Sequence, residues 1–416
     1  MRVAVVGAGI SGIAAAHYAQ EFADVTLYEA DRVLGGHTDT HNLFADDRSC
    51  AVDSGFIVFN TGYYPLFSRW LDELGVASKP TDMSFGVSLA NGVEYGTSNL
   101  KALFCQHRNI LRPDFLAMLR DIPRFYRRAG QLVDDDRTLA ELCAEERYSS
   151  AFVNGHLMPM CAALWSASRS LASAMPVAHV AAFMANHGLL QLRHRPAWRV
   201  VDGGSNTYLA AFESRFRGQV RKSCPVRHVL RDADGVTLQT DTDACGFDQV
   251  VLACHADDAL RIVDPTSREH SVLGAFGYQT NRAVIHSDAS VMPANRGAWS
   301  SWNVHATHEN EFEFTYWMNR LQGIHSTRQF FVTLNPARPL NAVWLERDYR
   351  HPVFDSAART AQARRDEVNA QCTLYCGAYW GWGFHEDGFR SGYEAAQRLR
   401  EICLGELCFG FETRAT

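Results

Sequence analysis

Three glycines and one acid near the start of the chain have the types and spacing to bind a dinucleotide. Gly7 would allow a tight turn, Gly9 would let backbone approach a pyrophosphate, and Gly12 would let a helix lie close on a sheet. The phosphates would then face a helix N-terminus, where free N–H groups and the helix dipole favour negative charge. Glu29 follows about 20 residues later, where a carboxylate accepts hydrogen bonds from a ribose.

The elements that must position these residues are visible in the hydrophobic pattern. Residues 3–6 and 24–28 predict two buried strands, and the stretch between them predicts a helix that begins after Gly9. Glycine turns are common, so a strand, turn and helix without a ligand is the alternative. The agreement of strand, helix, second strand and acid favours a nucleotide site.

A second glycine pair follows at Gly35-Gly36, with His37 next to it and the segment Val52 to Phe56 shortly after. The pair brings additional backbone up to the dinucleotide, which domains that bind only NAD seldom need. The second glycine pair therefore distinguishes this chain from domains that bind only NAD.

Composition excludes several other classes of protein. The formal charge of -6 without a basic tract argues against a nucleic-acid partner. The 11 cysteines include no CxxC spacing and predict no metal site; they are typical of free thiols in a reducing cytoplasm. No apolar run approaches the roughly 20 residues of a membrane span, so we expect no transmembrane segment, while peripheral membrane contact stays open.

The segment YEADRVLGGHTDT resembles the EAxxxxGGR motif of the FAD-dependent amine oxidase and phytoene desaturase superfamily. Two further segments, one after Asp202 and one running from Tyr375 to Gly392, resemble the family's other FAD motifs in the same order. The resemblance implies FAD as the cofactor. It also implies a weaker or neutral contact at His37, because the family usually has Arg there.

Transferred position by position, the resemblance and the glycine pattern imply a set of FAD-binding residues. They are Gly7, Gly9, Ile10, Ser11, Gly12, Glu29, Ala30, Gly35, Gly36, His37, Gly55, Phe56, Val226, Gly377, Phe384, Asp387 and Gly388. Val226 matches the family's adenine-contacting valine, and Asp387 stands where the family has glycine.

The expected fold class is α/β, with a Rossmann-type FAD-binding domain in three discontinuous segments and an α+β substrate domain, as in amine oxidases. The FAD-binding domain is expected over residues 1–80, 196–265 and 367–416. The substrate domain is expected over 81–195, mostly helical, and 266–366, mostly antiparallel sheet.

The amine oxidases of this superfamily usually carry a lysine near the flavin N5 in the substrate domain. This chain has no lysine beyond Lys222, and Asn281-Arg282 occupies the corresponding neighbourhood. Phe384 stands where the family has a tyrosine in an aromatic cage over the flavin. Amine oxidation thereby becomes the weaker hypothesis.

We expect instead an FAD-dependent oxidoreductase that dehydrogenates or oxidises a hydrophobic substrate such as a lipid acyl chain. Several motifs, among them DSGFIVFN and CGAYWGWGFHEDG, resemble a bacterial branch often encoded beside cyclopropane-fatty-acid synthases, which suggests a lipid-modifying enzyme as partner. The alternatives are a flavin-dependent C=C isomerase, an ordinary amine oxidase, and a non-catalytic FAD-containing partner of a lipid-modifying enzyme.

The aromatic residues between Tyr379 and His385 alternate with glycines, which weaken a core strand but let a flat ring approach the backbone. We expect them beside the isoalloxazine. The predicted substrate wall comprises Trp317, Tyr379, Trp380 and Trp382. The predicted catalytic residues are His385, titrating near neutral pH, and Tyr316; the alternative for His385 is a helix-start residue satisfied by backbone.

Overall fold

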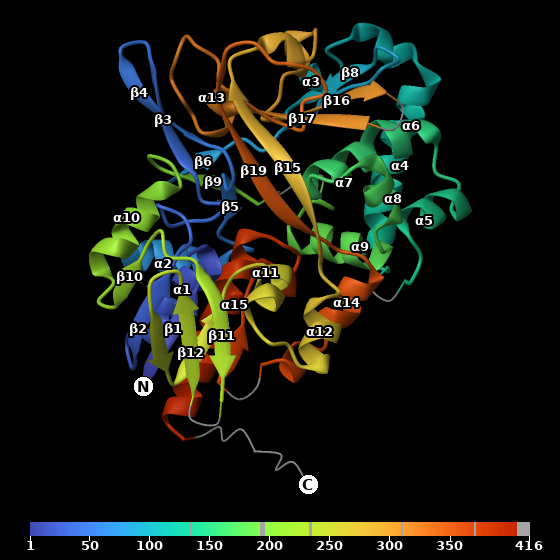
Figure 1. Cartoon of the computed structure of the whole chain (residues 1–416). Helices are drawn as coiled ribbons and strands as arrows, with labels where there is room; N and C mark the ends of the chain where they lie inside the picture. Colours follow the sequence, from blue (N-terminus) through green and yellow to red (C-terminus); the bar gives the residue numbers. More distant parts are fainter. Residues whose placement is uncertain (133–134, 192–195, 233–234, 309–310, 370–371, 406–416) are drawn as a thin grey trace.

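The computed structural model describes residues 1–132, 135–191, 196–232, 235–308, 311–369 and 372–405 (Figure 1). Its first layer is a five-stranded parallel sheet in the order β10-β2-β1-β14-β20. These strands are β1 (Arg2–Val6), β2 (Asp24–Tyr28), β10 (Gln219–Arg221), β14 (Gln249–Leu252) and β20 (Thr373–Tyr375). All five lie within the three ranges expected for the dinucleotide domain, which is the sheet of a Rossmann-type fold.

Two helices pack closely together in this domain, α1 (Ile10–Ala19) and α15 (His385–Cys403). Gly392 makes the approach possible, because a Cβ there would lie 2.0 Å from the Ser11 backbone oxygen. Gly12 lets α1 lie close to the turn after β1, since a Cβ there would lie 1.8 Å from the Gly7 oxygen. The domain also contains α2 (Pro65–Leu74), α10 (Asn206–Arg215), α11 (Ala256–Ile262) and a small sheet of β11 (Val226–Arg231), β12 (Val236–Thr240) and β13 (Ala244–Phe247).

The second large sheet has seven strands in the order β19-β15-β18-β17-β16-β7-β8 and lies above the first in Figure 1. Its pairings are antiparallel except for β16 with β7. The strands are β7 (Phe85–Ser88), β8 (Glu94–Gly96), β15 (Gly277–His286), β16 (Trp302–His308), β17 (Glu311–Trp317), β18 (Phe331–Leu334) and β19 (Val343–Val353).

Helices from residues 100–186 pack against this sheet. The helix α4 (Pro113–Ala129) begins with a proline, which suits the first helical position, and Thr138 and Glu141 form a capping box at the start of α5 (Leu139–Glu145). The others are α3 (Leu100–Leu103), α6 (Ser150–Phe152), α7 (Met158–Trp165), α8 (Arg169–Ala174) and α9 (Val177–Asn186), with a 3-10 turn at His107–Leu111 and a π turn at Val153–Leu157.

Short elements connect the two large sheets. They are the hairpin β3 (Thr40–Ala45) and β4 (Arg48–Asp53), the sheet of β5 (Val58–Asn60), β9 (Trp198–Val201) and β6 (Ser78–Thr81), and the helices α12 (Ser267–Leu273) and α14 (Ser356–Gln362). The short helix α13 (Met318–Leu321) instead joins β17 to β18 within the seven-stranded sheet. Among the described residues, no helix combines the length and apolar character needed to cross a bilayer.

Candidate active site

One large cavity lies between the two sheets, with a volume of about 1800 Å³. A pocket for a single small ligand is typically 300 to about 1,000 Å³, so this cavity has room for a dinucleotide and a second molecule. Its wall combines the glycine turn after β1, the second glycine pair, the start of α15, and side chains from α3, α4, α7 and β17.

The end of the cavity formed by Gly7, Gly9, Gly35 and Gly36, here named the glycine cradle, is built from backbone. Gly7 has φ +98° and Gly36 has φ +59°, backbone conformations that residues with a side chain rarely adopt. A Cβ on Gly9 would meet nothing within 4 Å, and Gly9 lines the cavity, so this position is open to a ligand. Gly9 also pairs with Gly35 in a β-bridge, which joins the two glycine segments.

Two backbone groups fix the carboxylate of Glu29 at the edge of the glycine cradle. Its Oε2 accepts a hydrogen bond from the Ala8 N–H at 2.8 Å, and its Oε1 accepts one from the Asp31 N–H at 2.9 Å. Burial raises the pKa of Glu29. A carboxylate held in this way presents its remaining lone pairs to the cavity that it lines, as a ribose-binding acid must.

Two helix N-termini meet at the cavity wall, because α1 and α15 pack side by side and both begin there. Ile10 and Ser11 line the cavity from α1, and Phe384 and His385 line it from the start of α15. Both ends therefore direct partial positive charge into the same space.

The first turn of α15 is fixed by two acids that face away from the cavity. Asp387 Oδ2 accepts hydrogen bonds from the N–H groups of Trp382 and Phe384, each at 3.1 Å. Glu386 accepts hydrogen bonds from the Leu66 and Phe67 N–H groups, both at 3.0 Å, at the start of α2. Burial raises the pKa of Glu386 to about 7. These two carboxylates hold the aromatic turn and the helix start in place.

The structure does not support His385 as a group that titrates near neutral pH. Its ring stacks on Phe56 with centroids 3.6 Å apart, and its Nε2 forms a hydrogen bond with the Tyr208 hydroxyl at 2.9 Å. Burial lowers the pKa of His385 to about 3. The imidazole is therefore neutral across the physiological range. The alternative role, a structural residue at the start of a helix, fits His385 better. Its hydrogen-bond partner is the Tyr208 side chain and not the backbone.

His37 is also neutral. This agrees with the weaker or neutral contact expected from a histidine at a position where the family usually has arginine. Its ring lies 5.0 Å from that of Tyr349 and 5.1 Å from that of His351. Burial, reinforced by the neighbouring histidines, holds the pKa of His37 well below its usual value. Its Nε2 is buried and finds no hydrogen-bond partner in the described part of the chain. An unpartnered ring nitrogen beside the glycine cradle is consistent with a polar ligand there.

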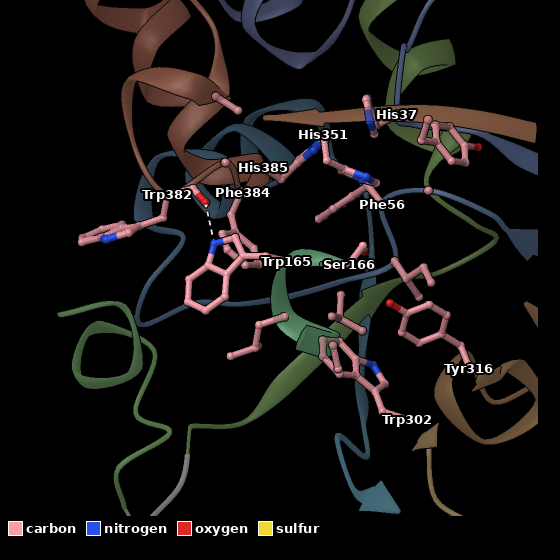
Figure 2. Close-up of a pocket in the computed structure, with 18 of the residues that line it drawn as sticks. His37, Phe56, Trp165, Ser166, Trp302, Tyr316, His351, Trp382, Phe384 and His385 are labelled. Carbon is pink, nitrogen blue, oxygen red and sulfur yellow. Dashed lines mark hydrogen bonds between the residues drawn. The ribbon is translucent and has the colours of Figure 1, made fainter. Parts of the chain in front are cut away.

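Aromatic side chains form the wall between the two ends of the cavity (Figure 2). The Trp165 Nε1 donates a hydrogen bond to the Trp382 carbonyl at 3.3 Å, which joins the end of α7 to the turn before α15. Ser166 ends α7 with φ 50°, and Gln279 donates a hydrogen bond to its carbonyl at 2.9 Å. This junction places Trp165 close to Phe384, with ring centroids 6.4 Å apart.

Tyr316 lies on the opposite side of this wall, with its ring 5.4 Å from that of Trp302 (Figure 2). Burial raises the pKa of Tyr316 to about 12. The phenol is thus protonated at neutral pH, and it can donate a hydrogen bond but not accept a proton as a base.

The remainder of the cavity, here named the apolar limb, is lined by α3, α4 and α7. Its lining residues carry no charge: Leu100, Leu103, Leu119, Ile122, Pro123, Tyr126, Met160, Ala163, Leu164 and Trp165. Leu100 is also 74% exposed, so the apolar limb reaches the protein surface at α3. The shape is that of an apolar channel that leads from the surface to the aromatic wall.

Most of the residues predicted to bind FAD line this cavity. They are Gly7, Gly9, Ile10, Ser11, Glu29, Gly35, Gly36, His37, Gly55, Phe56, Gly377 and Phe384, together with the predicted substrate-wall residues Tyr379 and Trp382 and the predicted catalytic residues His385 and Tyr316. The structure thus brings together segments that are more than 300 residues apart in the sequence.

Two predicted substrate-wall residues lie elsewhere. Trp317 follows Tyr316 on β17, so its side chain points to the opposite face of the sheet. There it packs on Trp299 with centroids 5.3 Å apart. Trp380 packs on Phe276 at 5.2 Å, within the core beside the parallel sheet. Neither residue therefore lines the cavity as predicted. Trp317 alternates with Tyr316 along the strand, whereas the Trp380 ring packs with that of Tyr379, 5.0 Å away, on the same Phe276.

Five residues predicted to bind FAD do not line the cavity. Gly12 and Gly388 serve helix packing, since a Cβ on Gly388 would lie 2.8 Å from the Ile10 side chain. Asp387 caps the turn, Val226 lies in the core beside the parallel sheet, and Ala30 is exposed.

Sequence reasoning missed Trp165, Ser166 and Glu386. The first two end a helix within residues 81–195, the expected helical part of the substrate domain, and no local pattern distinguishes their cavity-facing role. Glu386 had a weak signal, because an acid in the first turn of a helix is a common capping residue; its partner at the start of α2 is 319 residues away and invisible in the sequence.

The family model described as flavin containing amine oxidoreductase matches residues 10–287. No curated protein matches the chain. A solved structure of putrescine oxidase bound to putrescine is similar with a TM-score of 0.71 at 16% identity, over 96% of this chain and 99% of that chain. Cyclohexylamine oxidase from Brevibacterium oxydans IH-35A gives the same TM-score, identity and coverage.

A CLA-producing fatty acid isomerase from P. acnes is similar with a TM-score of 0.68 at 13% identity, over 95% of this chain and 98% of that chain. At such identities these similarities show a shared fold.

Proposed function

The chain belongs to the flavin-containing amine oxidoreductase family and is an FAD-dependent oxidoreductase; from this premise we propose that it dehydrogenates or oxidises a hydrophobic substrate, a lipid acyl chain. The observation that carries the proposal is the apolar limb. It offers an uncharged wall from the surface at Leu100 to the aromatic wall at Phe384 and Tyr316. Such a wall favours the binding of a long apolar molecule. It disfavours the binding of a charged one, because a buried charge without a partner is costly.

The residues of this chain fit FAD. The glycine cradle and the start of α1 would hold the pyrophosphate, Glu29 a ribose, and the start of α15 the flavin end, where the helix dipole favours negative charge. When bound, the flavin supplies the acceptor for two electrons from a C–H bond.

The chain's own contribution at the reacting end is to orient the substrate and exclude water. Phe384, Trp165 and Tyr316 surround that region with flat rings, and the hydrogen bonds at Trp382 and Ser166 hold this wall. Tyr316 keeps its proton because its pKa is about 12, so we assign it a positioning hydrogen bond. His385 positions Phe56 and the start of α15 through its stacking contact.

An amine substrate is less consistent with this cavity. None of the described residues that line it is a lysine, and Asn281 on β15 already forms hydrogen bonds with His351 and Asn335, at 2.8 Å and 2.7 Å. Of the acids that line the cavity, Asp39, Asp82 and Asp258 are ion-paired with Arg347, Arg320 and Arg350 respectively. None of the described acids is among the lining residues of α3, α4 and α7. A protonated amine would therefore enter the apolar limb without a counter-charge, which is costly.

Isomerisation of a C=C bond is the second candidate. The apolar limb would serve an unsaturated acyl chain equally well, and a fatty acid isomerase has a similar fold. The two reactions differ in their electron balance, because isomerisation leaves the flavin oxidised after turnover. The cytoplasmic location and the lipid-modifying partner enzyme stay predictions.

Anaerobic flavin reduction tests the proposal. Holoenzyme is mixed with fatty acids, phospholipids, benzylamine or spermine in the absence of oxygen, and absorbance of the oxidised flavin is followed. We expect bleaching by acyl-chain substrates and little change with the amines. Bleaching by amines at rates ordinary for enzymes, about 1 to 1,000 per second, with none by lipids, would overturn the proposal.

A further inference from the structure

We propose that the surface formed by α3, the 3-10 turn at His107–Leu111 and the outer face of α4 docks on an anionic lipid bilayer and opens the apolar limb toward it. We name this surface the mouth patch. The proposal deepens the proposed function, on which the role of the limb as an acyl-chain channel rests.

Exposed apolar side chains are concentrated on the mouth patch. Of the ten large hydrophobic residues that are exposed in the described part of the chain, four lie between residues 100 and 116. They are Leu100, Ile110, Leu111 and Leu116, with exposed fractions of 74%, 51%, 85% and 47%. Single exposed leucines are ordinary, but a cluster beside a cavity opening marks an interaction site.

These residues lie on connected elements. The Phe104 ring at the end of α3 lies 6.0 Å from the Phe115 ring in the first turn of α4, and the 3-10 turn leads into α4. Leu100 both lines the apolar limb and faces solvent, so the opening of the limb lies within the mouth patch.

The charge of this segment is opposite to that of the protein. Residues 98–128 contain seven Lys or Arg and two Asp, a net charge of +5, while the whole chain carries -6. The cations are Lys101, Arg108, Arg112, Arg120, Arg124, Arg127 and Arg128. Both acids are already paired within the segment, Asp114 with Arg112 and Asp121 with Arg120, and Arg128 is ion-paired with Glu146 outside the segment.

Cations and apolar side chains share the outer face of α4. Leu116 and Arg120 are four residues apart, so they lie on one side of the helix, and the Arg120 side chain is 72% exposed. Phe115, Met118 and Phe125 point into the core instead. An apolar cluster with basic neighbours is the pattern of a surface that lies in the headgroup region of an anionic membrane.

The choice of a bilayer over a protein partner follows from this combination. A protein partner would explain the apolar residues, but a cavity that opens within the same basic patch requires a partner that can deliver an apolar molecule. A bilayer of anionic lipids provides both the negative surface and the acyl chains. No described helix spans a membrane, so the contact is peripheral.

Vesicle cosedimentation tests the proposal with full-length holoenzyme. The probes are vesicles of phosphatidylcholine alone and vesicles that also contain phosphatidylglycerol. We expect binding only to the second, and weaker binding at higher salt. Ile110→Ser with Leu111→Ser should reduce binding tenfold or more, because two apolar side chains no longer insert.

Lys101→Gln with Arg108→Gln should weaken binding by about fivefold for each charge removed. Phe44→Ser is the matched control, since Phe44 is 68% exposed on β3, away from the mouth patch, and this variant should bind as the wild type does. Flavin content of every variant, and flavin reduction by substrate dispersed in detergent, should be unchanged.

The outcomes separate the two proposals. Wild-type enzyme that reduces its flavin with acyl chains in detergent but does not bind anionic vesicles would overturn the docking proposal alone. Vesicle binding that the mouth-patch variants lose, without flavin reduction by any lipid, would support docking and overturn the proposed function. A dimer in solution that Ile110→Ser with Leu111→Ser dissociates, without vesicle binding, would assign the mouth patch to a second copy of the chain and overturn docking.

Discussion

The two ends of the cavity are built on opposite principles. At the glycine cradle the wall is backbone, Gly7 and Gly36 have backbone conformations that other residues rarely adopt, and Glu29 is fixed by N–H groups. In the apolar limb the wall is made of uncharged side chains from three helices. A substitution in the glycine cradle should therefore abolish FAD binding altogether. A substitution in the apolar limb should change the preference for substrates of different chain length gradually.

The largest effect is expected at the cradle. Gly9→Trp places an indole in the space where a Cβ meets nothing within 4 Å, so the fold should survive while FAD is excluded. The purified variant should be colourless by absorbance and native by circular dichroism. Gly130→Trp, at another glycine with open space, should stay yellow. Flavin retained by the Gly9 variant would show that the cradle is not the cofactor site.

A bulky residue in the apolar limb should leave FAD bound to the protein. Met160→Trp narrows the apolar limb, so it should lower the rate of flavin reduction by octadecenoyl substrates about tenfold or more and spare octanoyl ones. Met160→Leu, which nearly conserves volume, should change little. Equal loss with short and long chains would contradict the role of the limb.

A pH effect on stability should appear at the helix start that joins the two ends. The Glu386 pKa rises from 4.5 to about 7 on folding, so between these values the folded protein holds a proton that the unfolded chain has released. Stability relative to Glu386→Gln should therefore fall as pH rises through this window, by up to about 1.4 kcal/mol per pH unit. Urea unfolding at several pH values measures the difference, and a flat difference would refute this assignment.

The smallest effect concerns His385. Because its pKa is about 3, His385→Gln should leave the pH profile of flavin reduction between about pH 6 and 8 unchanged, although the rate itself can fall as Phe56 loses its stacking partner. Stopped-flow reduction across that range is the measurement. An inflection near pH 6.5 that the variant loses would restore His385 as a proton carrier.

The same contrast explains what the sequence could predict. The cradle was predictable because its function depends on glycines, a strand and an acid at fixed spacing, and each leaves a local pattern. The limb was not, because Met160, Leu119 and Leu103 come from separate helices, and their apolar character is the same as that of any core residue. Tyr316 and Trp317 were predictable only in part. The sequence showed that both lie on a strand, but tertiary packing determines which face of that strand lines the cavity.

One measurement tests the central claim directly: anaerobic single turnover with a stoichiometric saturated or monounsaturated acyl chain, followed by mass spectrometry of the lipid. We expect one molecule of lipid that has lost two hydrogens for each flavin reduced. A lipid of unchanged mass with a shifted double bond and an oxidised flavin would establish isomerisation instead. Reduction by amines alone would contradict the assignment of the apolar limb to an acyl chain.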